Sequence, residues 1–141
     1  MWSKAGTEVA YTRVPAGGGD RQVVVHTPGQ PAAVLFSAKG AWYVLDFSPD
    51  DARILVRHYV SINESYLYEF DRHTGALNPL LDLGLRIAIG TARYDQDGGV
   101  LFTSDLGSEF VRLHRLALTS GRIELLSGDL AWDVETFEVA A

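Results

Sequence analysis

The 141-residue sequence predicts an all-β protein built of propeller blades, and three observations carry this prediction. Glycine turns recur at a nearly fixed interval, short runs of strand-forming residues flank each turn, and no clear helical segment interrupts them. A period of roughly 40–50 residues that holds four short strands is typical of a β-propeller blade. Helical repeats of similar length would contain amphipathic helices.

The repeat is visible in two kinds of turn. Gly29, Gly75 and Gly121 are spaced by 46 residues each, and strand-forming residues precede each of these turns. A second turn follows an aromatic residue in each unit and recurs at intervals of 45 and 47 residues, at Trp2, Phe47 and Tyr94. Glycine supplies the positive φ that tight hairpin turns require, so each unit reads as strand, turn and strand.

The central unit shows the expected strands most clearly. We expect them at about 42–47, 53–60, 65–71 and 76–83, because apolar and polar residues alternate there as in half-buried strands. Leucines after residue 76 have helical spacing, but Pro79 and Gly84 interrupt them, so we interpret this stretch as a strand and a connection.

The repeat predicts a partial propeller of about three four-stranded antiparallel blades within one domain, residues 1–141. The blades are expected at about residues 2–36, 42–83 and 89–127, with the opening strand of a fourth at 132–139. Trp42 and Trp132 occupy equivalent places in the repeat, and we expect both to pack between blades. Closed propellers have about 4–8 blades, so a fragment of a longer propeller is expected, or self-association through the open blade faces.

Composition excludes several classes of protein. Net charge is −6, with 12 Lys and Arg against 18 Asp and Glu, which argues against a nucleic-acid or anionic membrane surface. Without cysteine there is no disulfide, no thiol catalysis and no cysteine metal site. The absence of a signal peptide and of cysteine favours a cytoplasmic over a secreted protein.

Three segments resemble a known family. The turn Phe47-Ser48-Pro49-Asp50-Asp51 is similar to the aromatic–Ser–Pro–Asp–Gly turn of TolB-like (WD-type) propeller repeats, and more closely of the N-terminal propeller of prolyl oligopeptidase family serine peptidases. Residues 101–110 resemble the blade segment "TSD…SEF" of bacterial members, and residues 132–137 resemble "WDVE.F". Asp51 departs from the pattern because glycine is usual there, and Gln96 departs because proline is common.

The resemblance implies a Ser-Asp-His triad in an α/β-hydrolase domain, with the nucleophile on a G-x-S-x-G turn. This chain has no G-x-S-x-G, so we expect no catalytic residues and no activity in the chain alone. The expected function is a non-catalytic propeller segment that gates peptide access to a hydrolase domain of the parent protein. The alternative is a stand-alone TolB-like module for protein–protein binding.

Two polar loops at strand ends are the candidate substrate- or partner-facing sites. They comprise Ser61, Asn63 and Glu64 in one loop and Ser104, Asp105, Ser108 and Glu109 in the other. A hydrogen-bonded turn between blade strands is the structural alternative for the second loop.

No cofactor or metal site is expected. The four histidines have no ligand spacing, and Asp95-Gln96-Asp97-Gly98 lacks the later ligands of a calcium loop and reads as a β-turn.

Overall fold

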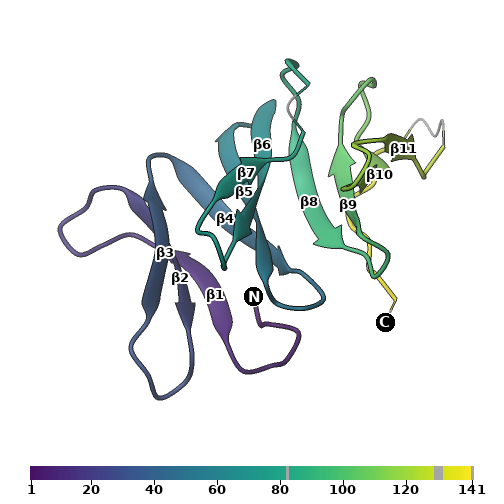
Figure 1. Cartoon of the computed structure of the whole chain (residues 1–141). Coiled ribbons are helices and arrows are strands. Elements are labelled where there is room, and N and C mark those ends of the chain that lie inside the picture. Colours follow the sequence, from purple (N-terminus) through teal and green to yellow (C-terminus); the bar gives the residue numbers. More distant parts are fainter. Residues whose placement is uncertain (82, 129–131, 141) are drawn as a thin grey trace.

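A computed structural model of the chain shows three antiparallel sheets arranged side by side (Figure 1). It describes residues 1–81, 83–128 and 132–140. The strands of the first sheet are β1 (Val9–Arg13), β2 (Arg21–His26) and β3 (Ala33–Ala38). Those of the second are β4 (Ala41–Phe47), β5 (Arg53–Ser61), β6 (Glu64–Asp71) and β7 (Leu77–Pro79). Those of the third are β8 (Ile89–Tyr94), β9 (Gly99–Ser104), β10 (Arg112–Ala117) and β11 (Ile123–Leu125).

Each sheet is a meander in which consecutive strands pair. This confirms the predicted fold class, a partial β-propeller of about three blades, and we refer to the sheets as the first, second and third blades. The described residues contain no helix, hence none that could cross a membrane.

The inner edge of the first blade differs from that of the other two. β4 and β8 are the first strands of their blades and contact each other, and β1 also contacts β4. The first blade has three strands, and Met1 and Trp2 lie beside β1 where the other blades have their first strand. Ala10 N donates to Met1 O at 2.8 Å, and Trp2 forms a bridge with Val9.

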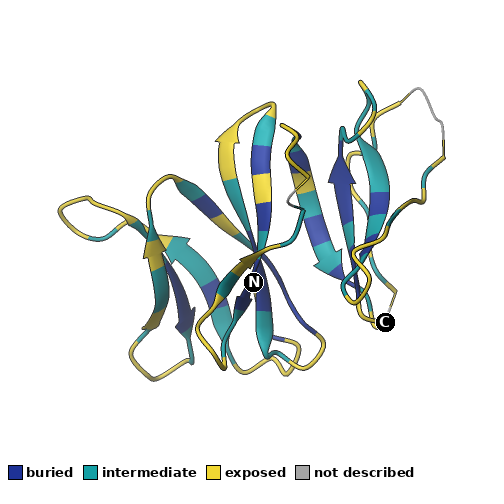
Figure 2. Ribbon diagram, turned by 45° about the horizontal axis from the view of Figure 1, so that its top comes forward, coloured by how far each residue is buried: buried dark blue, intermediate teal, exposed yellow. Residues whose placement is uncertain are grey.

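Two hydrophobic interfaces hold the three blades together. Strand residues alternate between the two faces of a sheet, so the second blade buries one set of side chains against each neighbour. Ile54 and Val56 pack toward the first blade, whereas Leu55 and Leu67 pack toward the third. Figure 2 shows this burial as stripes along the strands, with the exposed residues mainly in the loops.

The turn between β4 and β5 shows how local sequence shapes a blade. Ser48 Oγ donates to Asp50 Oδ1 at 2.7 Å and accepts from Arg53 N at 2.9 Å, which closes the turn. Asp51 adopts φ of 59°, in the left-handed region that glycine prefers. The family pattern has glycine at this position, and aspartate is one of the few other residue types that tolerate a positive φ.

Residues 132–140 differ from expectation in that none of them lies in a strand. Val134 N donates to Val111 O at 2.8 Å, and Val111 N donates to Asp133 Oδ1 at 2.8 Å. Trp132 is 75% exposed, so the expected packing between blades is wrong for Trp132 and right for Trp42, which is 6% exposed. The physical reason is that no sheet among the described residues covers Trp132. The opening of a further blade at 132–139 stays a prediction.

Candidate functional site

A cleft of about 840 Å³ lies where the ends of the inner strands meet the turns that follow them. β4 contributes Asp46, and β8 contributes Arg93 and Tyr94. The turns contribute Lys4, Pro49, Asp95 and Gln96, and Met1 and residues 136–140 complete the lining. We call this the inner cleft.

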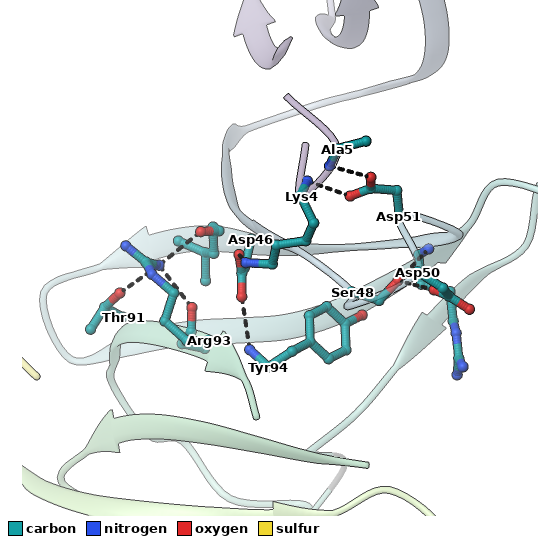
Figure 3. A network of polar contacts seen from close by, with 12 residues as sticks. Lys4, Ala5, Asp46, Ser48, Asp50, Asp51, Thr91, Arg93 and Tyr94 are labelled. Carbon is teal, nitrogen blue, oxygen red and sulfur yellow. Dashed lines mark hydrogen bonds and ion pairs between the residues drawn. The ribbon is translucent and has the colours of Figure 1, made fainter. Parts of the chain in front are cut away.

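Asp46 is the centre of the polar network that ties three blades together at the inner cleft (Figure 3). Its carboxylate is buried, and Lys4 Nζ lies 2.8 Å from Oδ1. Tyr94 N donates to the other oxygen, Oδ2, at 2.9 Å. A buried carboxylate needs such partners because burial without them is costly. Asp46 therefore joins the turn before β1, the end of β4 and the end of β8.

A second contact fixes the turn of the first blade to that of the second. Lys4 N and Ala5 N donate to the two carboxylate oxygens of Asp51 at 2.6 Å and 3.0 Å. Beside them Arg72 forms an ion pair with Glu8, with Nη2 2.8 Å from Oε2, and donates to Asp51 O at 3.0 Å. These contacts hold the backbone of Lys4, and with it the ion pair to Asp46.

Arg93 fastens β8 to β4 from inside the cleft. Its Nη1 donates to Leu45 O at 2.7 Å, to Ala92 O at 2.9 Å and to Thr91 Oγ1 at 3.2 Å. In Figure 3 the other end of the guanidinium points away from these acceptors. Among the described residues no carboxylate forms an ion pair with Arg93.

Behind the cleft, the Tyr94 ring enters the interface between the second and third blades. Its hydroxyl donates to Glu69 Oε2 at 2.7 Å, and Arg53 Nη1 lies 3.5 Å from Glu69 Oε1. Burial and the nearby Glu69 carboxylate raise the pKa of the Tyr94 hydroxyl, so it remains a proton donor to Glu69.

Asp95 is the second carboxylate in the lining, and it is fully used by neighbours. Arg115 Nε lies 2.6 Å from Oδ2, and Gly99 N and Asp97 N each donate to Oδ1 at 2.8 Å. Burial opposes ionisation, but these hydrogen bonds outweigh it and hold the pKa of Asp95 below its usual value. This confirms that residues 95–98 form a turn, as the repeat predicts.

The first of the two sequence-predicted loops lies at the opposite end of the strands from the inner cleft. Ser61 and Asn63 are exposed, and Ser61 Oγ accepts from Asn63 N at 3.3 Å. Glu64 forms an ion pair with Arg86, with 3.1 Å between Oε1 and Nε, and accepts from the Tyr66 hydroxyl. The hydrogen bond between Asn63 N and Ser61 Oγ therefore closes the turn itself.

The second loop is largely occupied by its own hydrogen bonds. Ser104 is buried and its Oγ accepts from Leu106 N at 3.1 Å, and Ser108 Oγ accepts from Phe110 N at 3.0 Å. Asp105 Oδ1 accepts from Ala88 N at 2.9 Å, whereas Glu109 is exposed. These contacts match the structural alternative of a hydrogen-bonded turn, and a partner-facing role of the loop stays a prediction.

The connection between β7 and β8 links the two loops. Arg86 pairs with Glu64, and Ala88 N donates to Asp105 Oδ1 at 2.9 Å. Directly after the connection, Ile89 N of β8 donates to Ser65 Oγ of β6 at 2.6 Å. The structure thus brings the predicted loops into one polar region, separate from the inner cleft. Sequence reasoning missed the inner cleft, although the repeat placed Lys4, Pro49 and Gln96 in equivalent turns and so at one end of the blades.

Within the described ranges no group of three or more His, Asp or Glu side chains could hold a metal ion. His58 stacks on Trp42 with ring centroids 4.4 Å apart, and His114 stacks on Phe102 at 5.1 Å. The interface histidines therefore serve packing contacts.

No family model and no curated protein matches the sequence. Solved structures match in fold. TolB from Acinetobacter baumannii has a TM-score of 0.72 at 22% identity, over 93% of this chain and 32% of that chain. A prolyl endopeptidase has 0.76 at 14%, over 92% and 21%. The β-propeller domain of the Trilobed protease from Pyrococcus furiosus has 0.67 at 21%, over 94% and 40%.

The fold and the inner cleft define a propeller module. Its structural neighbours are TolB propellers and the propeller domains of prolyl oligopeptidases and related peptidases, which is the class that the sequence resemblance predicted. The chain spans less than half the length of each of these neighbours.

Proposed function

We propose that this chain is the non-catalytic propeller segment of a prolyl oligopeptidase-like serine peptidase. In this proposal it limits the access of peptide substrates to an α/β-hydrolase domain that a longer parent chain carries. The observation that carries the proposal is the inner cleft, a hollow with fixed walls on the inner strands of a peptidase-like propeller.

A gate that selects by size needs walls that do not yield to a large peptide. Lys4, Asp46 and the backbone of Tyr94 join the blades at the end of the inner strands where the cleft lies. Arg57 makes a second contact further along, where its Nη1 donates to Ile89 O at 3.1 Å and also to Gly90 O. These inter-blade contacts oppose any widening between β4 and β8.

Among the described residues no serine hydroxyl is hydrogen-bonded to a histidine that could act as its base. The serines of the chain are not in a G-x-S-x-G turn, and the ring of His114 is buried against Phe102. We therefore expect the purified 141-residue chain to show no peptidase or esterase activity. Labelling of a serine in this chain by a fluorophosphonate probe would contradict the proposal.

The decisive test is the reading frame around the coding sequence. A propeller segment of a peptidase requires further blades in the same frame, together with a G-x-S-x-G and later Asp and His residues. A frame that encodes no hydrolase domain would overturn the peptidase proposal.

If the frame encodes a hydrolase domain, the gate is tested in that longer protein. Asp46→Asn weakens the contact with Lys4, so peptides that are too long for the parent should be cleaved with a higher kcat/KM, while short ones change little. Arg122→Gln, in the exposed turn between β10 and β11, is the matched control. Equal effects of Asp46→Asn on long and short peptides would argue against a size filter.

The second candidate function is a stand-alone TolB-like binding module, which the two TolB neighbours at TM-scores of 0.72 and 0.74 favour. In that case the polar loops at 61–64 and 104–109 would contact a protein partner. Affinity capture with the wild-type chain and with a Glu64→Ala, Glu109→Ala variant distinguishes the two functions. A partner that is lost with the loop variant, together with a frame that lacks a hydrolase domain, would favour the binding module.

A further inference from the structure

Arg93 differs from four other arginines of the chain in its bonding partners, and it shares with Arg57 a set of neutral acceptors. Arg115 pairs with Asp95, Arg72 with Glu8, Arg53 with Glu69 and Arg86 with Glu64. Arg93 pairs with no carboxylate in the part of the chain that the structure describes, and its three hydrogen bonds go to two carbonyl oxygens and one hydroxyl. A half-buried cation with only neutral acceptors retains most of its attraction for an anion.

The free donors of Arg93 form the side of the guanidinium that suits a carboxylate. All three of its hydrogen bonds come from Nη1, which leaves the Nε–H and the Nη2–H groups without a partner among the described residues. These groups lie in one plane and can bind both oxygens of a carboxylate at once. Because Nη1 is held by Leu45 O and its neighbours, the fork is already oriented and little ordering is needed on binding.

We propose that Arg93 binds the carboxylate of a short peptide in the inner cleft. The choice of a peptide rests on the proposed function, whereas the carboxylate chemistry rests on Arg93 and its surroundings.

The remaining lining supports this ligand. Two carboxylates in the lining already have a cation as partner: Asp46 pairs with Lys4, and Asp95 pairs with Arg115. Neither of them therefore competes with a ligand carboxylate for the guanidinium of Arg93. Pro49, Phe137 and Val139 give the cleft apolar surface that can cover the side chain next to the bound carboxylate. Glu138 also lines the cleft and is exposed, so its charge opposes an incoming anion.

The first experiment uses the wild-type 141-residue chain and three peptides. They are acetyl-Ala-Phe with a free carboxylate, the same peptide as its amide, and an amidated acetyl-Ala-Glu-Phe. Calorimetric titration should show binding of the acid and at least about tenfold weaker binding of the first amide. Binding of the third peptide alone would assign the site to acidic side chains, and binding of the first alone to peptide C-termini.

A spectroscopic signal of Arg93 itself makes the test independent of any variant. Binding of the acid should shift the Nε–H resonance of Arg93 and leave that of Arg122 unchanged. Equal affinities of acid and amide, or the absence of binding up to millimolar peptide, would overturn the proposal.

Three variants then separate ligand binding from a purely structural tie. Arg93→Lys keeps the charge but loses the planar fork, and Arg93→Met loses both, so affinity for the acid should fall in that order, with Arg122→Met as the control. Glu138→Gln removes a repulsion and should strengthen binding. If Arg93 serves only to tie β8 to β4, its variants will lower the melting temperature but leave the affinity at the wild-type value.

The peptide titration and the reading-frame test of the proposed function can fail independently of each other. A reading frame without a hydrolase domain removes the peptidase but leaves the carboxylate titration to be decided on its own. Conversely, absence of peptide binding by Arg93 leaves the size filter of a longer peptidase intact.

Discussion

The two interfaces between blades are built from different chemistry. The interface between the first and second blades contains a cluster of aromatic rings: Phe36, Trp42, His58, Tyr68 and Phe70, with neighbouring centroids 4.4–5.6 Å apart. The interface between the second and third blades is mainly aliphatic, with Leu45, Leu55, Leu67, Val100 and Leu116 in its core. One aromatic pair, Phe102 and His114, is found there among the described residues.

Polar groups are distributed in the opposite way. At the first interface the charged contacts of Asp51 and Glu8 lie at the rim, in the turns. At the second, the hydrogen bonds of Tyr94 with Glu69 and of Ser65 with Ile89 are buried. When one sheet shifts relative to the other, a buried hydrogen bond breaks and leaves its donor and acceptor unpaired. Buried hydrogen bonds therefore favour one relative position of the two sheets. Buried polar contacts therefore fix how the second and third blades pack on each other. This packing positions β8 and, with it, the inner cleft.

The largest effect is expected from emptying the core of either interface. Phe102→Ala and Phe47→Ala each remove a fully buried ring, so each should lower the free energy of unfolding by about 3–5 kcal/mol. Denaturant unfolding of both variants measures the two interfaces on one scale. A loss below about 1 kcal/mol for one of them would show that its interface contributes little to stability.

A smaller effect distinguishes the polar interface from the aromatic one. Tyr94→Phe leaves the buried Glu69 without its hydroxyl donor, so we expect a loss of about 1–3 kcal/mol. Tyr68→Phe is the control, because the hydroxyl of Tyr68 has no hydrogen bond among the described residues and its removal should cost little. Equal costs in thermal unfolding would refute the idea that buried polar contacts specify the second interface.

The rim contact of the first interface should contribute less. Asp51→Asn keeps a residue that tolerates positive φ but can accept well from only one of the two amides of Lys4 and Ala5. We expect a loss of about 0.5–1 kcal/mol that shrinks in high salt, because this contact is near solvent. Asp97→Asn, in the equivalent turn of the third blade, should be neutral, and a larger cost there would contradict this view of the rim.

The smallest effect is a dependence on pH at the second interface. Burial lowers the pKa of His114 from its ordinary value of 6.5, which means that the folded state prefers the neutral ring. The folded protein therefore loses stability as pH falls below about 6.5 toward the lower folded pKa, and no further below it. His114→Gln should flatten this part of the profile of unfolding free energy against pH; an unchanged slope between pH 7 and 5 would exclude His114 as its source.

Much of the fold could be predicted because its signals are local. Gly75 and Gly121 adopt the positive φ that their turns require, and the strands expected at 53–60 and 65–71 match β5 and β6 within one residue. The strand expected at 76–83 is shorter in the structure, Leu77–Pro79, and directly after it Leu80 N still donates to Leu67 O of β6 at 2.9 Å. The loop residues were placed correctly at strand ends, but the pattern could not tell whether Asp105 faces a partner or caps a neighbouring backbone N–H.

The inner cleft could not be predicted, because its contacts join residues far apart in sequence. Tyr94 N meets Asp46, and Arg93 meets Leu45 O, each across 48 residues. Nothing in the residues next to Arg93 and Arg115 indicates that one lacks a carboxylate and the other pairs with Asp95. Repeats, turns and strand faces depend on near neighbours, so the sequence alone determined them. The partner of each buried charge depends on how two sheets approach, so only the tertiary structure decided that Arg115 pairs with a carboxylate and Arg93 does not.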